Sequence, residues 1–276
     1  MRKRGFSIGA LSDIGHVKKT NQDRILIKIG EEMHGEFGLF LVADGMGGLT
    51  AGDKASEIVI TEFKLWWDTR LSIILNNIKK NNLSIINKEL DNLVFHINGK
   101  IIKFSKEINC RVGTTLSMLL IFRNQFIIKH VGDSRIYKIN KEMVKLTKDH
   151  SWVAEQVRQG KMSEREAKNH PRSHVLLQCI GVNERVDIFR KIGEVLEDDV
   201  FLLCSDGFYN LLTKDEILEA IEEYKESDED IQNKVEKLME KVKARGAVDN
   251  ASAILIYQNH DEEKIGVLQK LKDLIG

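Results

Sequence analysis

The chain is organised around the stretch Val42-Ala43-Asp44-Gly45-Met46-Gly47-Gly48, which ends an apolar run that begins at Phe37. A continuous apolar run predicts a strand that is buried on both faces. Glycines just past a strand adopt conformations that other residues disfavour, and they let the backbone approach a ligand closely. The stretch therefore predicts a buried strand that delivers the Asp44 carboxylate to a site.

Further apolar runs also carry an aspartate at one end. The run 200–204 leads to Asp206, and Asp249 lies just before the run 251–257. Each of these aspartates alone is typical of a turn, since Asp and Gly are common turn residues. Carboxylates collected at strand ends repel one another unless a cation holds them, and ligation by oxygen alone favours Mg²⁺ or Mn²⁺ over zinc or copper. Together the aspartates indicate a metal site.

Other motifs accompany these aspartates in order along the chain. The blocks are 12–24, 42–48, 113–116, 131–137, 146–151, 205–207 and 249–252. Any one tripeptide is weak evidence, but blocks in this order over nearly the whole chain are very specific. On these residues the sequence resembles the metal-dependent protein phosphatase family of type 2C, in its bacterial form.

Strands interleaved with pairs of long helices predict an α+β fold. The resemblance implies a four-layer α-β-β-α sandwich, in which two antiparallel sheets lie face to face between helical layers. It also implies a phosphatase catalytic domain over residues 1–258, with a flap at about 148–174 beside the active site. Residues 259–276 form a short C-terminal tail with apolar residues at helical spacing, which we interpret as a terminal helix rather than a docking helix.

The hydrophobic pattern predicts the individual elements. Helices are expected at 51–67, over the apolar stripe from Leu83 to Ile101, at 151–160 and 163–170 in the flap, after the capping box 213–216, and at 228–244. Strands are expected at 6–11, 25–29, 37–43, 114–122, 125–131, 135–139, 143–146, 186–192, 200–204 and 251–257. The four strands between 114 and 146 are predicted to form one antiparallel meander.

The resemblance also implies roles for individual residues. Asp44 would bridge two metal ions, and Gly45 would offer its main-chain carbonyl to one of them. Asp206 and Asp249 would complete the other ion. Asp23 would lie near the ion held by Gly45, through water.

The implied cofactors are Mn²⁺ or Mg²⁺, with two core ions and a third, weaker site formed by Asp133 with Asp206. The implied reaction is the hydrolysis of phosphoserine or phosphothreonine in proteins by direct attack of a metal-bridging hydroxide. The implied partners are phosphorylated protein substrates and a Ser/Thr kinase whose action the enzyme reverses.

Two departures from the family pattern affect the chemistry. Lys18 stands where an arginine usually contacts the substrate phosphate, so a point charge replaces a planar bidentate fork. Exposure is the common fate of a lysine, so Lys18 is alternatively an ordinary solvated residue. Met46 stands where eukaryotic members carry a histidine. The leaving-group proton would then come from a metal-bound water or from a flap histidine such as His150 or His170.

Three rival readings remain open. The segment 47–54 approaches a P-loop, but Asp53 occupies the position of the phosphate-binding lysine. Cys179 and Arg185 match the C-x5-R spacing of cysteine phosphatases, although no histidine precedes the cysteine. A pseudophosphatase that binds phosphoproteins would be favoured by loss of the metal-bridging acids, and none of these acids is missing.

The composition limits the remaining possibilities. The 276 residues contain 42 Lys plus Arg and 42 Asp plus Glu, so no overall field favours nucleic acid or an anionic membrane. The 3 cysteines are scattered without metal-ligand spacing, which fits a reducing, cytoplasmic location. No apolar run approaches the length of a membrane span.

Overall fold

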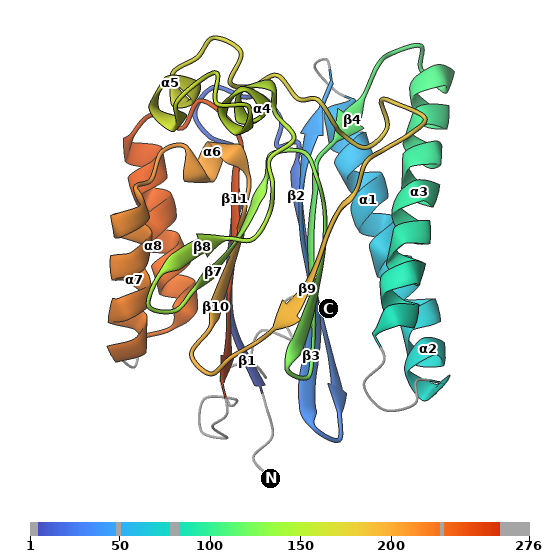
Figure 1. The fold of residues 1–276 in the computed structure, drawn as a ribbon, viewed down its shortest axis with the longest axis vertical. Coiled ribbons are helices and arrows are strands. Elements are labelled where there is room, and N and C mark those ends of the chain that lie inside the picture. The colour runs from blue at the N-terminus through green and yellow to red at the C-terminus, as the bar shows by residue number, and fades with distance from the viewer. Residues whose placement is uncertain (1–4, 48–50, 78–82, 227–228, 260–276) are drawn as a thin grey trace.

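Two β-sheets pack face to face, with helices on both outer faces (Figure 1). This computed structural model describes residues 5–47, 51–77, 83–226 and 229–259. The expected α+β fold with an α-β-β-α sandwich is confirmed. Among the described residues, no helix is both long and apolar enough to cross a membrane.

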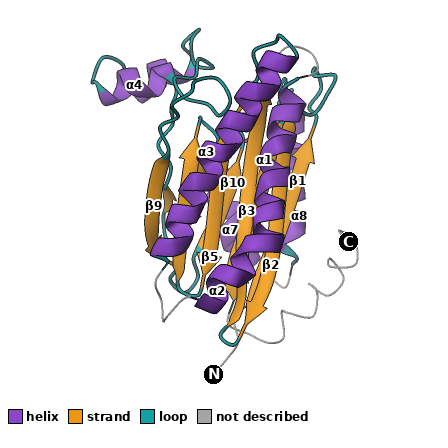
Figure 2. Ribbon diagram, turned by 90° about the vertical axis from the view of Figure 1, so that its right-hand side faces the viewer, coloured by secondary structure: helices purple, strands orange, loops and turns teal. Residues whose placement is uncertain are grey.

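The first sheet has six strands, in the order β2-β3-β5-β6-β9, and β4 pairs with the end of β3. The strands are antiparallel and comprise β2 (Asp23–Glu32), β3 (Gly35–Met46), β4 (Gly113–Thr114), β5 (Leu116–Phe122), β6 (Gln125–Val131) and β9 (Phe189–Glu194). Helices α1 (Gly52–Trp66), α2 (Ser72–Asn77) and α3 (Ser84–Glu107) cover its outer face (Figure 2).

The second sheet has five strands, in the order β1-β11-β10-β7-β8. These are β1 (Gly5–Asp13), β11 (Ala251–Asn259), β10 (Val200–Cys204), β7 (Arg135–Ile139) and β8 (Met143–Lys145). Helices α7 (Lys214–Glu226) and α8 (Ile231–Ala244) cover its outer face. The neighbouring strands β10 and β11 adjoin two of the candidate aspartates, because Asp206 follows the end of β10 and Asp249 precedes the start of β11.

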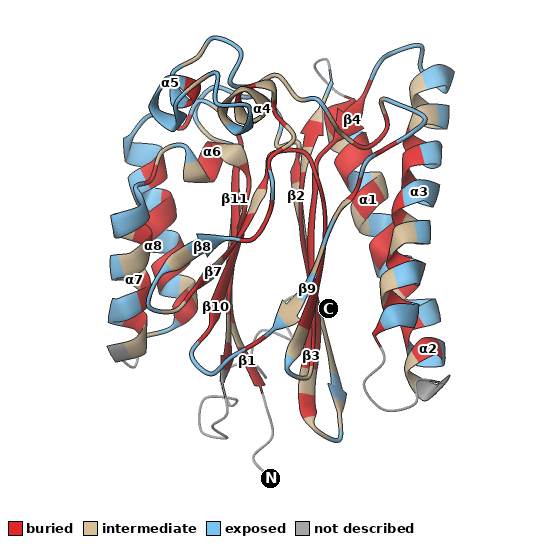
Figure 3. Ribbon diagram, in the orientation of Figure 1, coloured by how far each residue is buried: buried red, intermediate tan, exposed pale blue. Residues whose placement is uncertain are grey.

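Side-chain alternation along the central strands builds three apolar layers. In β3, Leu39, Leu41 and Ala43 pack with the helices, whereas Phe40 and Val42 pack between the two sheets. All five side chains are fully buried, because successive residues of a strand point to opposite faces and both faces are covered here. Figure 3 shows this burial along the central strands. The predicted burial of β3 on both faces is therefore confirmed.

The segment between β8 and β9 crosses one end of the sandwich. It contains the short helices α4 (Trp152–Arg158) and α5 (Glu164–Lys168), which lie over this end together with α6 (Asp206–Tyr209) (Figure 1). Ser163 and Glu166 form the predicted capping box at the start of α5. We call residues 148–174 the flap.

The predicted meander over 114–146 is wrong. Strands β5 and β6 belong to the first sheet, whereas β7 and β8 belong to the second. The chain changes sheets between Val131 and Arg135, where Gly132 has φ +112. A local pattern of strands and turns is the same for one sheet as for two, so the sequence does not reveal this crossing.

Other boundaries differ more modestly. The strand expected at 186–192 forms at Phe189–Glu194, and the strand expected at 114–122 is interrupted at Thr115. The helix expected at 51–67 ends at Trp66 and continues as a π-helical turn, η1 (Trp67–Leu71), before α2. In the tail expected at 259–276, Asn259 ends β11 and residues 260–276 lie outside the described part of the chain.

Candidate metal centre

Asp44 lies near the end of β3, and its main chain is fixed by two threonines. Its N–H donates to Thr115 Oγ1 at 2.9 Å. Its carbonyl accepts hydrogen bonds from Thr114 Oγ1 at 2.9 Å and from the Thr115 N–H at 2.8 Å. A Cβ at Gly45 would lie 2.1 Å from the Gly52 carbonyl oxygen, so this position accepts only glycine. The block 113–116 therefore fixes the main chain of Asp44.

Asp206 and Asp249 approach each other because β10 and β11 are antiparallel neighbours. Asp206 follows β10, and Asp249 precedes β11. A Cβ at Gly207 would lie 2.0 Å from the Asn250 carbonyl oxygen, which shows how closely the two segments pack. Burial raises the pKa of the Asp206 carboxyl, and the charge of Asp249 raises it further.

Asp23 connects the two sheets. It is the register partner of Asp44 in the first sheet. Its Oδ2 accepts hydrogen bonds, both at 2.7 Å, from the hydroxyls of Ser205, which directly follows β10, and Ser252 in β11 of the second sheet. Its Oδ1 is buried and has no hydrogen-bond partner among the described residues. Burial is the main cause that raises the pKa of Asp23 to about 6.

These carboxylates act on one another as a group, which we call the aspartate cluster: Asp23, Asp44, Asp133, Asp206 and Asp249. Burial raises the pKa of Asp44 well above its usual range, and the charges of the other four members raise it further. Burial also raises the pKa of Asp133 well above its usual range. Buried like charges of this kind are unfavourable unless protons or cations neutralise them.

The cluster offers only oxygen ligands, which are the ligands that Mg²⁺ and Mn²⁺ prefer. Within the described ranges, no group of three or more His, Cys, Asp or Glu side chains is arranged closely enough to hold a metal ion by itself. Mg²⁺ keeps several of its waters and binds through one or two carboxylates. The unpartnered Oδ1 of Asp23 and the mutual repulsion within the cluster are the features that such a cation would satisfy.

Lys18 lies at the edge of the cluster. Its Nζ is 2.7 Å from Asp249 Oδ1, and its side chain is 42% exposed. Burial opposes protonation, but Asp249 and the charges of Asp44 and Asp206 raise the pKa of Lys18. The loop that carries Lys18 is held by the His16 N–H, which donates to the Ala247 carbonyl at 2.8 Å. The structure therefore brings Lys18 to the carboxylates.

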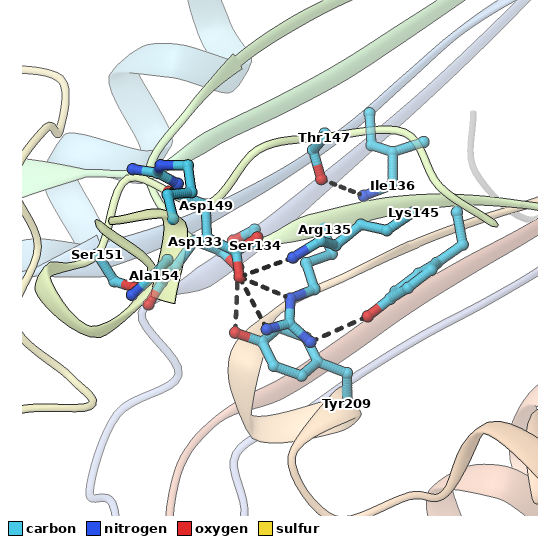
Figure 4. Close-up of polar contacts among 12 residues, drawn as sticks. Asp133, Ser134, Arg135, Ile136, Lys145, Thr147, Asp149, Ser151, Ala154 and Tyr209 are labelled. Carbon is cyan, nitrogen blue, oxygen red and sulfur yellow. Dashed lines mark hydrogen bonds and ion pairs between the residues drawn. The ribbon is translucent and has the colours of Figure 1, made fainter. Parts of the chain in front are cut away.

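Asp133 lies in the crossing between the sheets and is buried. Its carbonyl accepts a hydrogen bond from the Tyr209 hydroxyl at 3.2 Å (Figure 4). Tyr209 in turn stacks with Arg135, which pairs with Asp149. Arg135 and Asp149 lie within the sequence blocks, but no sequence pattern predicted a role for them. Tyr209 was missed altogether, and its position three residues after Asp206 is the signal that could have identified it.

The candidate general acids lie in the flap. His150 Nδ1 accepts a hydrogen bond of 3.3 Å from the Gly132 N–H, and burial lowers the pKa of His150. His150 also lines a cleft between the flap and β9. The ring of His170 packs against Trp152, with 5.0 Å between ring centres. Neither contact identifies a proton donor, so both roles stay predictions.

The rival cysteine lacks the properties of a nucleophile. Burial raises the pKa of the Cys179 thiol to about 11. A reactive cysteine needs a lowered pKa, because the thiolate is the attacking form. Arg185, the proposed phosphate contact of that reading, is exposed.

A known protein family matches most of the chain. The model of the family protein phosphatase 2C matches residues 15–243. The protein phosphatase PhpP of Streptococcus pneumoniae is 32% identical over 264 residues, which cover 93% of this chain and 99% of PhpP.

Solved structures agree with this match. The Streptococcus agalactiae serine/threonine phosphatase superposes with a TM-score of 0.79 and 30% identity, over 92% of this chain and 99% of that one. The catalytic domain of the serine/threonine phosphatase PstP, solved with two manganese ions, gives a TM-score of 0.75 and 26% identity, over 93% and 99% of the two chains.

Proposed function

The chain belongs to the protein phosphatase 2C family and is a bacterial serine/threonine phosphatase, and we propose that it works with Mn²⁺ or Mg²⁺ held by the aspartate cluster. The observation that carries this proposal is the convergence of four buried or partly buried carboxylates, from both sheets and the crossing between them, on Asp44. Two manganese ions in the related PstP structure support it. We assign the catalytic domain to residues 1–258.

The residues present allow a division of labour around these ions. Asp44 is central to the cluster, and the carbonyl of Gly45 and the carboxylates of Asp206 and Asp249 are the further ligands that we propose. Asp133 with Asp206 would hold a third, weaker ion. When bound, such ions would lower the pKa of a coordinated water to near neutral pH and offset the charge that develops on the phosphoryl group. Water would then attack phosphorus directly, without a covalent intermediate on the protein.

Lys18 is the residue that we propose for substrate phosphate binding. An ammonium has three donors, and the contact with Asp249 uses one of them. Its pKa is raised by the surrounding carboxylates, so the side chain keeps its positive charge at neutral pH. A half-exposed cation next to the cluster suits a phosphoryl group presented on the surface of another protein. The proposed substrates are therefore phosphoproteins, and the proposed partner is the Ser/Thr kinase that phosphorylates them.

Hydrolysis of a phosphothreonine peptide tests this proposal. We expect turnover with Mn²⁺, loss of turnover with excess chelator, and resistance to vanadate, which inhibits cysteine phosphatases. Cys179→Ser should leave turnover nearly unchanged, because a partly buried thiol with a pKa of about 11 is not a thiolate at neutral pH.

Other outcomes would contradict the proposal. Activity in chelator, together with an inactive but folded Cys179→Ser variant, would favour the cysteine mechanism. A folded wild-type protein that binds Mn²⁺ and phosphopeptide without hydrolysis would favour a pseudophosphatase.

A further inference from the structure

A stacked arginine, Arg135, lies at the centre of a partly buried polar cluster formed with Tyr137, Lys145, Asp149 and Tyr209, beside the candidate metal site (Figure 4). The guanidinium carbon of Arg135 lies 3.7 Å from the centre of the Tyr209 ring. Its Nε and one terminal nitrogen donate to Asp149 Oδ2 at 3.1 and 2.8 Å, and the other terminal nitrogen donates to the Tyr137 hydroxyl at 3.0 Å. Both the face and the edge of the guanidinium are therefore used, which fixes its orientation.

One side of this cluster reaches the proposed metal ligands. Arg135 lies two residues after Asp133, and Tyr209 ends the short helix α6 that begins at Asp206. The Tyr209 hydroxyl donates to the Asp133 carbonyl at 3.2 Å. The stacked pair thus joins the two segments that carry Asp133 and Asp206.

The other side reaches the flap. The Asp149 carbonyl accepts a hydrogen bond of 2.9 Å from Arg158, the last residue of α4. The next residue, His150, donates its N–H to the Gly132 carbonyl at 2.7 Å. The root of the flap is therefore bound both to the sheet crossing and, through Arg135, to α6.

The ion pair between Arg135 and Asp149 orients these two side chains more than it stabilises the fold. Asp149 is only 4% exposed. Although burial opposes ionisation, the positive charges of Arg135 and Lys145 hold the pKa of Asp149 below its usual value. A buried ion pair adds little net stability because desolvation offsets the attraction, but its geometry is strongly fixed. Such a pair is suited to positioning.

We propose that Arg135, Asp149 and Tyr209 are positioning residues that set the main chain at Asp133, and with it the weaker cation site, according to how the flap is seated. This inference rests on the proposed function, because the weaker site belongs to that proposal. The three residues do not touch substrate in this scheme. They act through the Asp133 carbonyl and the root of the flap.

Calorimetric titration with Mn²⁺ tests the contact between Tyr209 and Asp133. Tyr209→Phe keeps the ring under Arg135 and removes the hydroxyl. We expect the weakest cation to bind about fivefold less tightly, the value of one ordinary hydrogen bond, while the tighter ions bind as in the wild type. The matched control is Tyr257→Phe, which loses a hydroxyl contact of the same 3.2 Å length to Asp198, a residue outside the cluster.

Limited trypsin digestion tests the connection with the flap. Arg135→Lys keeps the charge but loses the fork and the stacking, so we expect roughly tenfold faster cleavage at exposed flap sites such as Lys161 and Arg165 in the presence of Mn²⁺.

We also expect the kcat of Tyr209→Phe on phosphothreonine peptide to fall at limiting Mn²⁺ and to recover at saturating Mn²⁺. A merely structural defect would not recover in this way.

Several results would overturn the inference. These are a wild-type titration without a weaker site, a Tyr209→Phe titration equal to that of Tyr257→Phe, or equal weakening of all ions with a lower melting temperature. If Arg135→Lys does not fold, Tyr209→Phe still decides. The titration and the digestion need no substrate, so a wild-type protein that binds Mn²⁺ without hydrolysing phosphopeptide would refute the proposed function and leave this test intact.

Discussion

Neutralising Asp23 should stabilise the metal-free protein at neutral pH. The pKa of Asp23 is about 6 in the folded protein, compared with 3.8 for a fully exposed aspartate. Between these values the folded state binds more protons than the unfolded state, so this group makes stability fall as pH rises from about 4 to about 6. The difference corresponds to about 3 kcal/mol at pH 7. Asp23→Asn removes this penalty and can still accept hydrogen bonds from Ser205 and Ser252.

Urea unfolding followed by tryptophan fluorescence measures this effect. In chelator, we expect Asp23→Asn to be more stable than the wild type at pH 7.5, by up to about 3 kcal/mol. At pH 4.5 the two proteins should be closer, because much of Asp23 is then protonated in the wild type. Glu142→Gln is the matched control, since Glu142 is exposed in the turn before β8. Saturating Mn²⁺ should reverse the order, because cations stabilise the ionised cluster.

The reasoning would be refuted by either of two results. One is an Asp23→Asn variant that is no more stable than the wild type at pH 7.5 in chelator. The other is an equal loss of stability for both proteins between pH 4.5 and pH 7.5. Either result would mean that the carboxylate is already neutralised within the protein without a metal.

Two further predictions concern catalysis. Lys18→Ala should lower kcat/KM for a phosphothreonine peptide by about ten- to hundredfold, because a charge-assisted hydrogen bond to the phosphate is lost. Lys19→Ala should change kcat/KM little, and Lys18→Arg should match or exceed the wild type. Equal, near-wild-type values of kcat/KM for the two alanine variants would remove Lys18 from the site. Asp44→Asn, Asp206→Asn and Asp249→Asn should each abolish turnover yet remain folded by circular dichroism, and marked loss of thermal stability in chelator for all three would indicate structural roles instead.

The parts of the site that the sequence predicted are those at the ends of buried strands. Asp44, Asp206 and Asp249 each adjoin an apolar run, so local pattern and position in the fold carry the same information. The structure places all three in one cluster. Only the family resemblance predicted that Lys18 lies at this site, because nothing in the local sequence distinguishes Lys18 from Lys19.

The parts that the sequence did not predict depend on contacts between distant segments. The Tyr209 hydroxyl and the Asp133 carbonyl are 76 residues apart, and no local pattern reports such a hydrogen bond. The division of β5–β8 between two sheets has the same origin. Pairing partners are set by packing over the whole domain, whereas hydrophobic alternation reports only which residues of a strand are buried.

The hydrogen bonds of Asp23 to Ser205 and Ser252 cross from one sheet to the other. Asp23 and Asp44 come from the first sheet, and Asp206 and Asp249 flank strands of the second, so neither sheet alone contains the cluster. A cation whose ligands come from both sheets does not stabilise partly folded states in which the two sheets have not yet packed together. Its binding energy should then appear in the unfolding rate, which bound Mn²⁺ slows, while the rate of folding changes little.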